Sequence, residues 1–112
     1  TVAPVLVGAS LGGHVALKYA AARIPVRGLL LLAPVRVLEE SLVEAYSRFR
    51  FPVRIVCGSE DRVMSLEELR NLVNRLPNAK LTVYEGAGHA AYLDNPERFK
   101  RDLLELYATA EQ

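Results

Sequence analysis

Four short apolar runs, each followed by a longer segment with helical spacing, constrain the fold of this chain more than any other feature. The runs cover residues 2–7, 28–33, 53–57 and 80–84. The first two are apolar throughout, without alternation, and this pattern is typical of strands that helices cover on both faces. The sequence therefore predicts an α/β fold of the order βαβαβαβα, with a four-stranded parallel sheet whose strands lie side by side in sequence order.

The first two intervening segments carry apolar side chains at the spacing of amphipathic helices. The segment after the first run predicts a helix over residues 11–22. Its inward-facing stripe is expected to consist of Val15, Ala16, Tyr19 and Ala20. A second helix is expected over residues 38–49, with a core-facing side formed by Leu38, Leu42, Ala45, Tyr46 and Phe49.

The third and fourth helices begin at capping residues. Ser65 stands three residues before Glu68, which is the Ser-x-x-Glu pattern of a capping box, and Pro77 ends that helix. Asn95 followed by Pro96 supplies an N-cap and a first-turn proline for the last helix. The core-facing side chains of the last helix are expected to be Phe99, Leu103, Leu106 and Tyr107.

Composition excludes several classes of partner. The 112 residues include 14 Lys and Arg and 13 Asp and Glu, a formal net charge of +1, without a basic stripe that would follow phosphates. No apolar stretch approaches the roughly 18 to 20 residues of a membrane span. We therefore expect residues 1–112 to form a single soluble α/β domain that binds neither nucleic acid nor membrane.

Cysteine and histidine are scarce, which bears on cofactors and location. Cys57 is the one cysteine, so it has no internal disulfide partner, and its apolar run favours a small buried core residue. This fits a reducing compartment, and we expect a cytoplasmic protein. The two histidines and the cysteine are widely separated and give no metal-ligand spacing, so neither a metal nor another cofactor is predicted.

The first candidate for chemistry directly follows the first apolar run. Gly8-Ala9-Ser10-Leu11-Gly12 matches Gly-x-Ser-x-Gly and opens a helix, which is the context of a nucleophile elbow. In such an elbow the serine occupies a strained turn that lifts its hydroxyl above the sheet, so its neighbours must be small. The alternative interpretation is a glycine-rich turn that packs tightly or binds an anion at a helix N-terminus.

Two further candidates follow later strands. Asp61 lies just after the third run, and His89 lies just after the fourth. Because the carboxyl ends of parallel strands meet at one end of a sheet, we expect both side chains near Ser10. A serine hydroxyl needs a base to become a good nucleophile, neutral imidazole can serve, and a carboxylate fixes the imidazole tautomer. The arrangement predicts a site for acyl transfer.

Other titratable side chains remain alternatives. Glu60 and Asp94 also lie near the predicted site, and either is a candidate to replace Asp61, because a triad acid is defined by its geometry. His14, four residues after Ser10, is interpreted as an ordinary helix residue because the chain order favours His89 as the base.

Three segments resemble the α/β-hydrolase superfamily, especially its compact esterase, perhydrolase and lipase-like members. They are residues 6–13, 56–61 and 86–99, and the likeness covers nearly the whole chain. The resemblance implies that Ser10 is the nucleophile, Asp61 the triad acid and His89 the general base. It also implies that the backbone N–H of Leu11 is one donor of the oxyanion hole, and that the chain corresponds to the last four strands of a sheet that usually has eight.

The missing half has two expected consequences. The segment that normally supplies the second oxyanion donor is absent, and losing one such donor typically lowers the rate by about 10² to 10³. The first strand would also form an unpaired apolar edge, and part of one sheet face would be bare. We therefore expect a homodimer or larger assembly that pairs the first strands or covers the bare face.

The leading functional hypothesis is an esterase-like serine hydrolase that acts on small-molecule esters through an acyl-enzyme at Ser10. The main alternative is a catalytically idle scaffold, a truncated or designed half-fold that keeps the triad residues and mainly self-associates. A third is a fragment that works only when joined to the missing strands. All three predict the same residues, so the sequence does not separate them.

Overall fold

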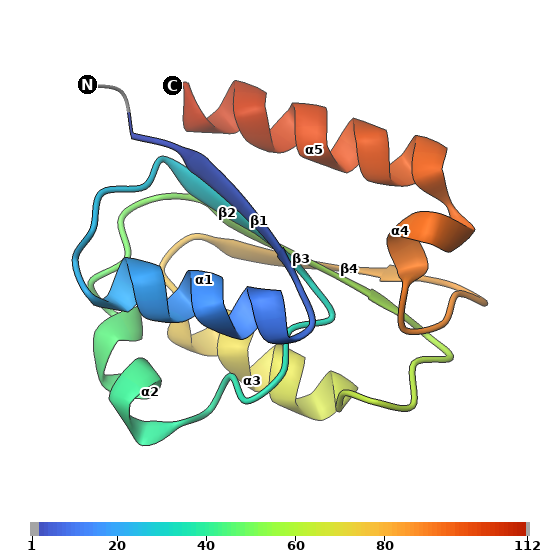
Figure 1. The fold of residues 1–112 in the computed structure, drawn as a ribbon, viewed down its shortest axis with the longest axis horizontal. Helices are drawn as coiled ribbons and strands as arrows, with labels where there is room; N and C mark the ends of the chain where they lie inside the picture. The colour runs from blue at the N-terminus through green and yellow to red at the C-terminus, as the bar shows by residue number, and fades with distance from the viewer. Residues whose placement is uncertain (1–2, 112) are drawn as a thin grey trace.

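The computed structural model describes residues 3–111, in which a parallel sheet lies between two layers of helices (Figure 1). The strands are β1 (Val5–Ala9), β2 (Gly28–Leu32), β3 (Val53–Gly58) and β4 (Ala79–Tyr84). They lie in the order β1-β2-β3-β4, and each neighbouring pair is parallel. The predicted fold class and strand order are confirmed.

Helices cover the two faces of the sheet unequally (Figure 1). Three lie on one face: α1 (Leu11–Ala21), α2 (Glu40–Tyr46) and α3 (Leu66–Arg75). The other face carries α5 (Pro96–Ala110) and the short α4 (Ala91–Asp94), which the sequence analysis did not predict. Both predicted caps are present, since Ser65 Oγ accepts a hydrogen bond from the Glu68 N–H and Asn95 Oδ1 accepts one from the Arg98 N–H.

The core forms two apolar layers because successive strand residues point to opposite faces. All five residues of β2 are buried. Leu29 and Leu31 belong to the larger cluster, beneath α1, α2 and α3, whereas Leu30 and Leu32 belong to the smaller cluster with Leu106 of α5. Cys57 is buried in the larger cluster as a free thiol, as predicted. Each buried leucine contributes about 1.5 to 3 kcal/mol of transfer free energy.

The structure corrects two predicted boundaries. The first strand was predicted over residues 2–7, but β1 is Val5–Ala9, because its ladder with β2 continues to the pair Ala9 and Leu32. Val2 lies outside the described residues. The second helix was predicted over residues 38–49, but α2 is only Glu40–Tyr46; Phe49 is still buried, in the turn that follows.

Two side chains predicted to face inward on α1 are exposed: Val15 is 59% exposed and Tyr19 is 36% exposed. This helix packs near the edge of the sheet that β1 forms. The residues on its buried side are Gly13, His14, Ala16, Leu17 and Ala20. Leu11, Val15 and Tyr19 follow one another at four-residue spacing and form an exposed row that we call the outer stripe of α1. On α5, Tyr107 is likewise exposed, whereas Leu106 is fully buried.

Among the described residues, β1 pairs with β2 alone and leaves one edge of the sheet free. Val5 contacts the cluster under α5 and Leu6 contacts the cluster under α1, so Val7 faces the α5 side. Val7 is 47% exposed. The expected free edge and partly bare face are therefore present in residues 3–111.

No helix within residues 3–111 has both the length and the apolar character needed to cross a membrane. In the same part of the chain, no group of three or more His, Cys, Asp or Glu side chains is placed to hold a metal ion.

Candidate active site

The predicted site residues follow the C-terminal ends of three strands and meet at one end of the sheet. Ser10 follows β1, Asp61 follows β3 and His89 follows β4. In a parallel sheet these ends point the same way, so three loops separated in sequence converge. The structure brings all three side chains into a continuous chain of hydrogen bonds.

Ser10 occupies a strained turn between β1 and α1. Its φ of 53° and ψ of −114° lie outside the regions that L-residues favour, at a cost of about 1 to 3 kcal/mol. The Ser10 N–H donates to the Leu32 carbonyl of β2 over 2.7 Å, which ties the turn to the neighbouring strand. A Cβ on Gly8 would overlap the carbonyl of Gly12, so the close approach of strand and helix requires glycine at that position. These features are those expected of a nucleophile elbow.

His89 lies between the serine and the acid. Its Nε2 is 3.0 Å from Ser10 Oγ, and its Nδ1 is 2.7 Å from Asp61 Oδ2. A carboxylate accepts hydrogen bonds, so Nδ1 carries the proton in the neutral ring and Nε2 has the free lone pair. The imidazole is therefore oriented to take a proton from the serine hydroxyl.

Asp61 is held inside the loop after β3, and its side chain is fully buried. One oxygen accepts the backbone N–H groups of Val63 at 2.7 Å and Met64 at 3.3 Å, while the other contacts His89. Burial acts to raise the pKa of Asp61, but the hydrogen bonds from His89, Val63 and Met64 outweigh it. The pKa of this carboxyl therefore lies below its ordinary value, and the group is an anion at neutral pH.

The loop that carries His89 is fixed by contacts that the sequence analysis missed. The N–H of Gly86 donates to Ser59 Oγ over 2.7 Å, and the N–H of Gly88 donates to Asp94 Oδ2 over 2.9 Å. A Cβ on Gly58 would overlap the carbonyl oxygens of Ala87 and Gly88, so the loop rests directly on the end of β3. A strand-end glycine followed by a hydroxyl residue was the only sequence signal for this packing.

These contacts also decide among the alternative residues. The carboxylate of Asp94 binds the backbone beside His89, whereas the carboxylate of Asp61 binds the imidazole itself. His14 is a buried residue of α1 whose Nδ1 is 3.2 Å from the Arg36 carbonyl and whose Nε2 is 3.6 Å from Glu39. Its ring is thus occupied within the α1–α2 layer, as expected of a helix residue.

A small cavity of about 60 Å³ opens beside the serine. It is lined by Ala9, Ser10, Leu32, His89, Ala90 and Tyr92. Leu11 is the first residue of α1, so its N–H is one of the groups that have no partner within the helix. The positive end of the helix dipole lies at the same place. The arrangement can hold a short apolar group next to a nucleophile and stabilise negative charge beside it.

Comparisons with known proteins identify the family of this chain. A family model described as the alpha/beta hydrolase fold matches residues 37–96, a segment that contains Asp61 and His89. The "Putative protein-lysine deacylase ABHD14B" of Rattus norvegicus is 34% identical over 103 residues, which are 91% of this chain and 48% of that protein. The "Putative carbamate hydrolase RutD" of Pseudomonas syringae is 34% identical over 80 residues, which are 70% of this chain and 31% of that protein.

The chain spans less than half the length of either relative. Among solved structures, a "predicted CIB-like hydrolase" from Thermoplasma acidophilum superposes on it with a TM-score of 0.81 at 28% identity. That superposition covers 96% of this chain and 51% of the other. The matched family model, the relatives and the shared fold lead to one conclusion: this chain belongs to the alpha/beta hydrolase family.

Proposed function

We propose that the chain is a serine hydrolase of small carboxylic esters that works through an acyl-enzyme at Ser10. The observation that carries the proposal is the hydrogen-bonded series from Ser10 Oγ through the imidazole of His89 to the carboxylate of Asp61. Nucleophile, base and orienting acid are the three groups that acyl transfer from a serine requires. The names of the two relatives, a putative deacylase and a putative carbamate hydrolase, describe reactions at acyl carbons and support this class of chemistry.

The first half of the reaction forms the acyl-enzyme. Ser10 Oγ bonds to the ester carbonyl carbon while His89 Nε2 takes the hydroxyl proton, and the carbonyl π electrons move to the oxygen. The buried Asp61 anion stabilises the imidazolium that forms. When the carbonyl re-forms, the bond to the alcohol breaks, and the leaving oxygen receives the proton from Nε2.

The second half repeats the cycle with water. His89 removes a proton from a water molecule, whose oxygen bonds to the acyl carbon. The ester bond to Ser10 Oγ then breaks, the serine recovers its proton from the imidazolium, and the carboxylic acid leaves. Both halves develop negative charge on the carbonyl oxygen, next to the N–H of Leu11 at the start of α1. With one donor of this kind assigned in residues 3–111, we expect slow turnover.

The cavity beside the serine limits the acyl group. Its volume of about 60 Å³ is well below the roughly 300 to 1,000 Å³ of sites that take drug-sized ligands. Leu32 and Tyr92 form part of its wall. We therefore expect p-nitrophenyl acetate to be a better substrate than the butyrate or octanoate ester, and Tyr92→Ala to reduce that preference.

A covalent probe and a chromogenic ester test the proposal. The protein is incubated with a fluorophosphonate and, separately, with p-nitrophenyl acetate, beside Ser10→Ala and His89→Ala. Labelling and turnover in the parent protein that disappear in both variants support the serine hydrolase. Equal residual hydrolysis in all three proteins would refute it and favour an idle scaffold. Arg101→Gln, which changes an exposed residue of α5 away from the three-residue series, should retain labelling.

A further inference from the structure

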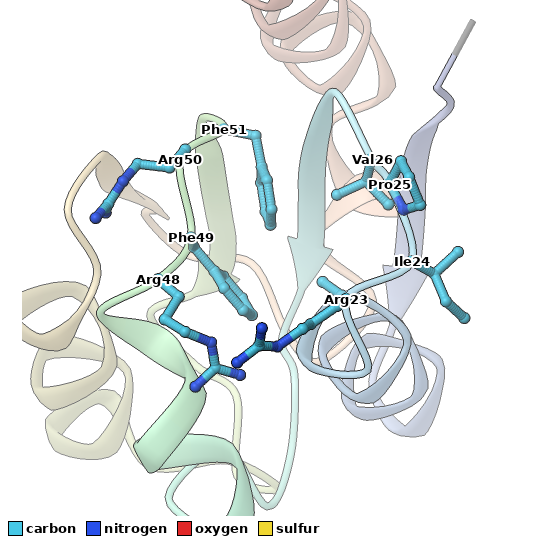
Figure 2. A pocket seen from close by; sticks show the side chains of 9 residues that line it. Arg23, Ile24, Pro25, Val26, Arg48, Phe49, Arg50 and Phe51 are labelled. Carbon is cyan, nitrogen blue, oxygen red and sulfur yellow. The ribbon is translucent and has the colours of Figure 1, made fainter. Parts of the chain in front are cut away.

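A second cavity lies at the end of the sheet opposite Ser10. Its volume is about 320 Å³, and it is formed by the loops that precede β2 and β3 (Figure 2). Its lining residues are Ala20, Arg23, Ile24, Pro25, Val26, Arg48, Phe49, Arg50 and Phe51, which we call the arginine pocket. Ser10, Asp61 and His89 follow the other ends of the strands, so none of them contributes to it. Its size is in the range of small-molecule sites.

The apolar part of the arginine pocket is rigid. The rings of Phe49 and Phe51 lie 4.9 Å apart at 34°, and Phe49 packs edge-on against Tyr46 at 5.5 Å. Phe49 is only 3% exposed and belongs to the main core cluster, which fixes its position. Both phenylalanine rings point into the cavity in Figure 2. The aromatic surface that a flat apolar group can reach is therefore that of the half-buried Phe51, and Phe49 supports this ring from the core side.

The polar part is cationic and has no counter-ion in residues 3–111. Neither Arg23 nor Arg48 takes part in any ion pair there. Figure 2 shows their guanidinium groups extending toward each other across the opening, whereas Arg50 turns away. Arg48 Nη1 donates to the Glu44 carbonyl over 3.3 Å, a contact that uses one of its five N–H groups. Two cations facing each other repel, and an anion between them removes that repulsion.

Helix ends explain only part of this arrangement. Arg23 and Arg48 both follow the C-terminus of a helix, where the dipole stabilises a cation. The dipole corresponds to about half a charge at each terminus, so the two guanidinium groups leave the arginine pocket positive overall. Arg23 also has a φ of 66°, a left-handed conformation that is usually filled by glycine or asparagine after a helix. An arginine side chain is therefore held at a position where its backbone is strained.

We propose that the arginine pocket binds a small organic oxyanion, an aryl phosphate or aryl carboxylate. The oxyanion lies between the guanidinium groups of Arg23 and Arg48, whose planar forks match such oxygens in paired hydrogen bonds. The aryl ring lies against Phe51, which Phe49 supports from the core. This site is independent of the proposed esterase chemistry, because it shares no residue with the candidate active site.

Isothermal titration with four probes tests the proposal: phenyl phosphate, benzoate, inorganic phosphate and phenol. Phenyl phosphate or benzoate should bind in a saturable 1:1 manner, and the stronger of the two identifies the head group. Inorganic phosphate should bind at least about tenfold more weakly than phenyl phosphate, and phenol should not bind measurably. Absence of saturable binding by both aryl anions would overturn the proposal, as would equal affinity for phenyl phosphate and inorganic phosphate.

Variants assign the binding to these residues. Arg23→Gln and Arg48→Gln should each lower the affinity for the preferred aryl anion by about tenfold or more. The matched control is Arg101→Gln, since Arg101 is an exposed residue of α5 and lies outside the arginine pocket. This variant should bind the aryl anion with the affinity of the parent protein. Circular dichroism verifies that each variant folds. Where a glutamine variant does not fold, the lysine variant at the same position, Arg23→Lys or Arg48→Lys, replaces it, because lysine keeps the charge without the fork. Equal affinities in the arginine pocket variants and Arg101→Gln would overturn the assignment.

Discussion

Asp61 illustrates how a single residue joins local folding to chemistry. Its carboxylate closes the turn after β3 by accepting two backbone N–H groups, and the same carboxylate orients His89. Because the side chain is fully buried, removing its charge affects both functions. The sequence analysis favoured Asp61 and kept Glu60 and Asp94 as alternatives, since the contact depends on the path of two loops. The folded chain places Asp61 against the imidazole and Asp94 against the backbone of Gly88.

The first prediction concerns the role of Asp61 in the proposed reaction. Asp61→Asn keeps the shape of the side chain but presents an amide to His89, which favours the wrong imidazole tautomer. We expect kcat for p-nitrophenyl acetate to fall by up to about 10⁴. Steady-state kinetics measures this, with fluorophosphonate labelling as a second readout. An Asp61→Asn protein as active as the parent would show that the acid does not act through His89.

The second prediction concerns acid stability. The pKa of Asp61 is lowered in the folded protein. The carboxylate of Asp61 therefore binds a proton less readily in the folded state than in the unfolded chain, where an aspartate has a pKa of about 3.9. The resulting stabilisation is complete above that unfolded value and is lost as the pH falls through the lower folded value. Urea unfolding between about pH 5 and pH 3 should show a smaller loss of unfolding free energy in Asp61→Asn than in the parent. Parallel curves for the two proteins would contradict this.

At the scale of elements, close approaches of the backbone set the geometry of the site. The end of β1 lies against the first turn of α1, and the end of β3 lies against the loop that carries His89. Glycine is required at Gly8 and Gly58 because any side chain there would overlap backbone atoms of the neighbouring element. Gly12, although part of the same pentapeptide motif, has open space where its Cβ would lie.

The third prediction follows from this difference. Gly58→Ala pushes the carbonyl groups of Ala87 and Gly88 away and displaces His89, so activity should fall by about 10² or more, the loss that a shift of about 1 Å produces. Gly12→Ala is the matched control and should keep activity close to that of the parent. Thermal unfolding monitors the fold of each. Equal activity in both variants would show that this packing does not position the histidine.

The predictability of the elements follows from the range of the interactions that define them. Local signals were sufficient for the strand order and for the caps at Ser65 and Asn95, because apolar runs and cap hydrogen bonds involve neighbours in sequence. The burial of α1 was predicted less well. Val15 and Tyr19 continue its apolar pattern, yet they are exposed, because burial depends on which elements stand beside the helix. The arginine pocket was not predicted for the same reason.

In the whole molecule, β1 is an edge strand of the sheet. The free backbone of this strand and the exposed Val7 lie at this edge, and α1, which carries the outer stripe, packs on β1. Unpaired strand edges and exposed apolar surface favour association. The expectation of a homodimer or larger assembly, the single-domain boundary at residues 1–112 and the cytoplasmic location all stay predictions.

The fourth prediction tests self-association. We expect sedimentation velocity at micromolar concentration to show a dimer or larger species, and Val7→Lys to shift it toward the monomer, because a charge at this edge opposes pairing. Leu104→Lys is the matched control, since Leu104 is also exposed but lies on α5. A stable monomer in the parent protein would contradict the prediction.

Ser10 directly follows β1, the edge strand, so pairing at this edge takes place next to the candidate active site. A chain that pairs with β1 stands beside the Ser10 hydroxyl. Linkage between binding equilibria is reciprocal: if a reversible ligand bound at Ser10 strengthens pairing, pairing strengthens the binding of that ligand by the same factor. The apparent affinity of the ligand would then rise with protein concentration, whereas a protein with its serine in mid-sheet would show a constant value.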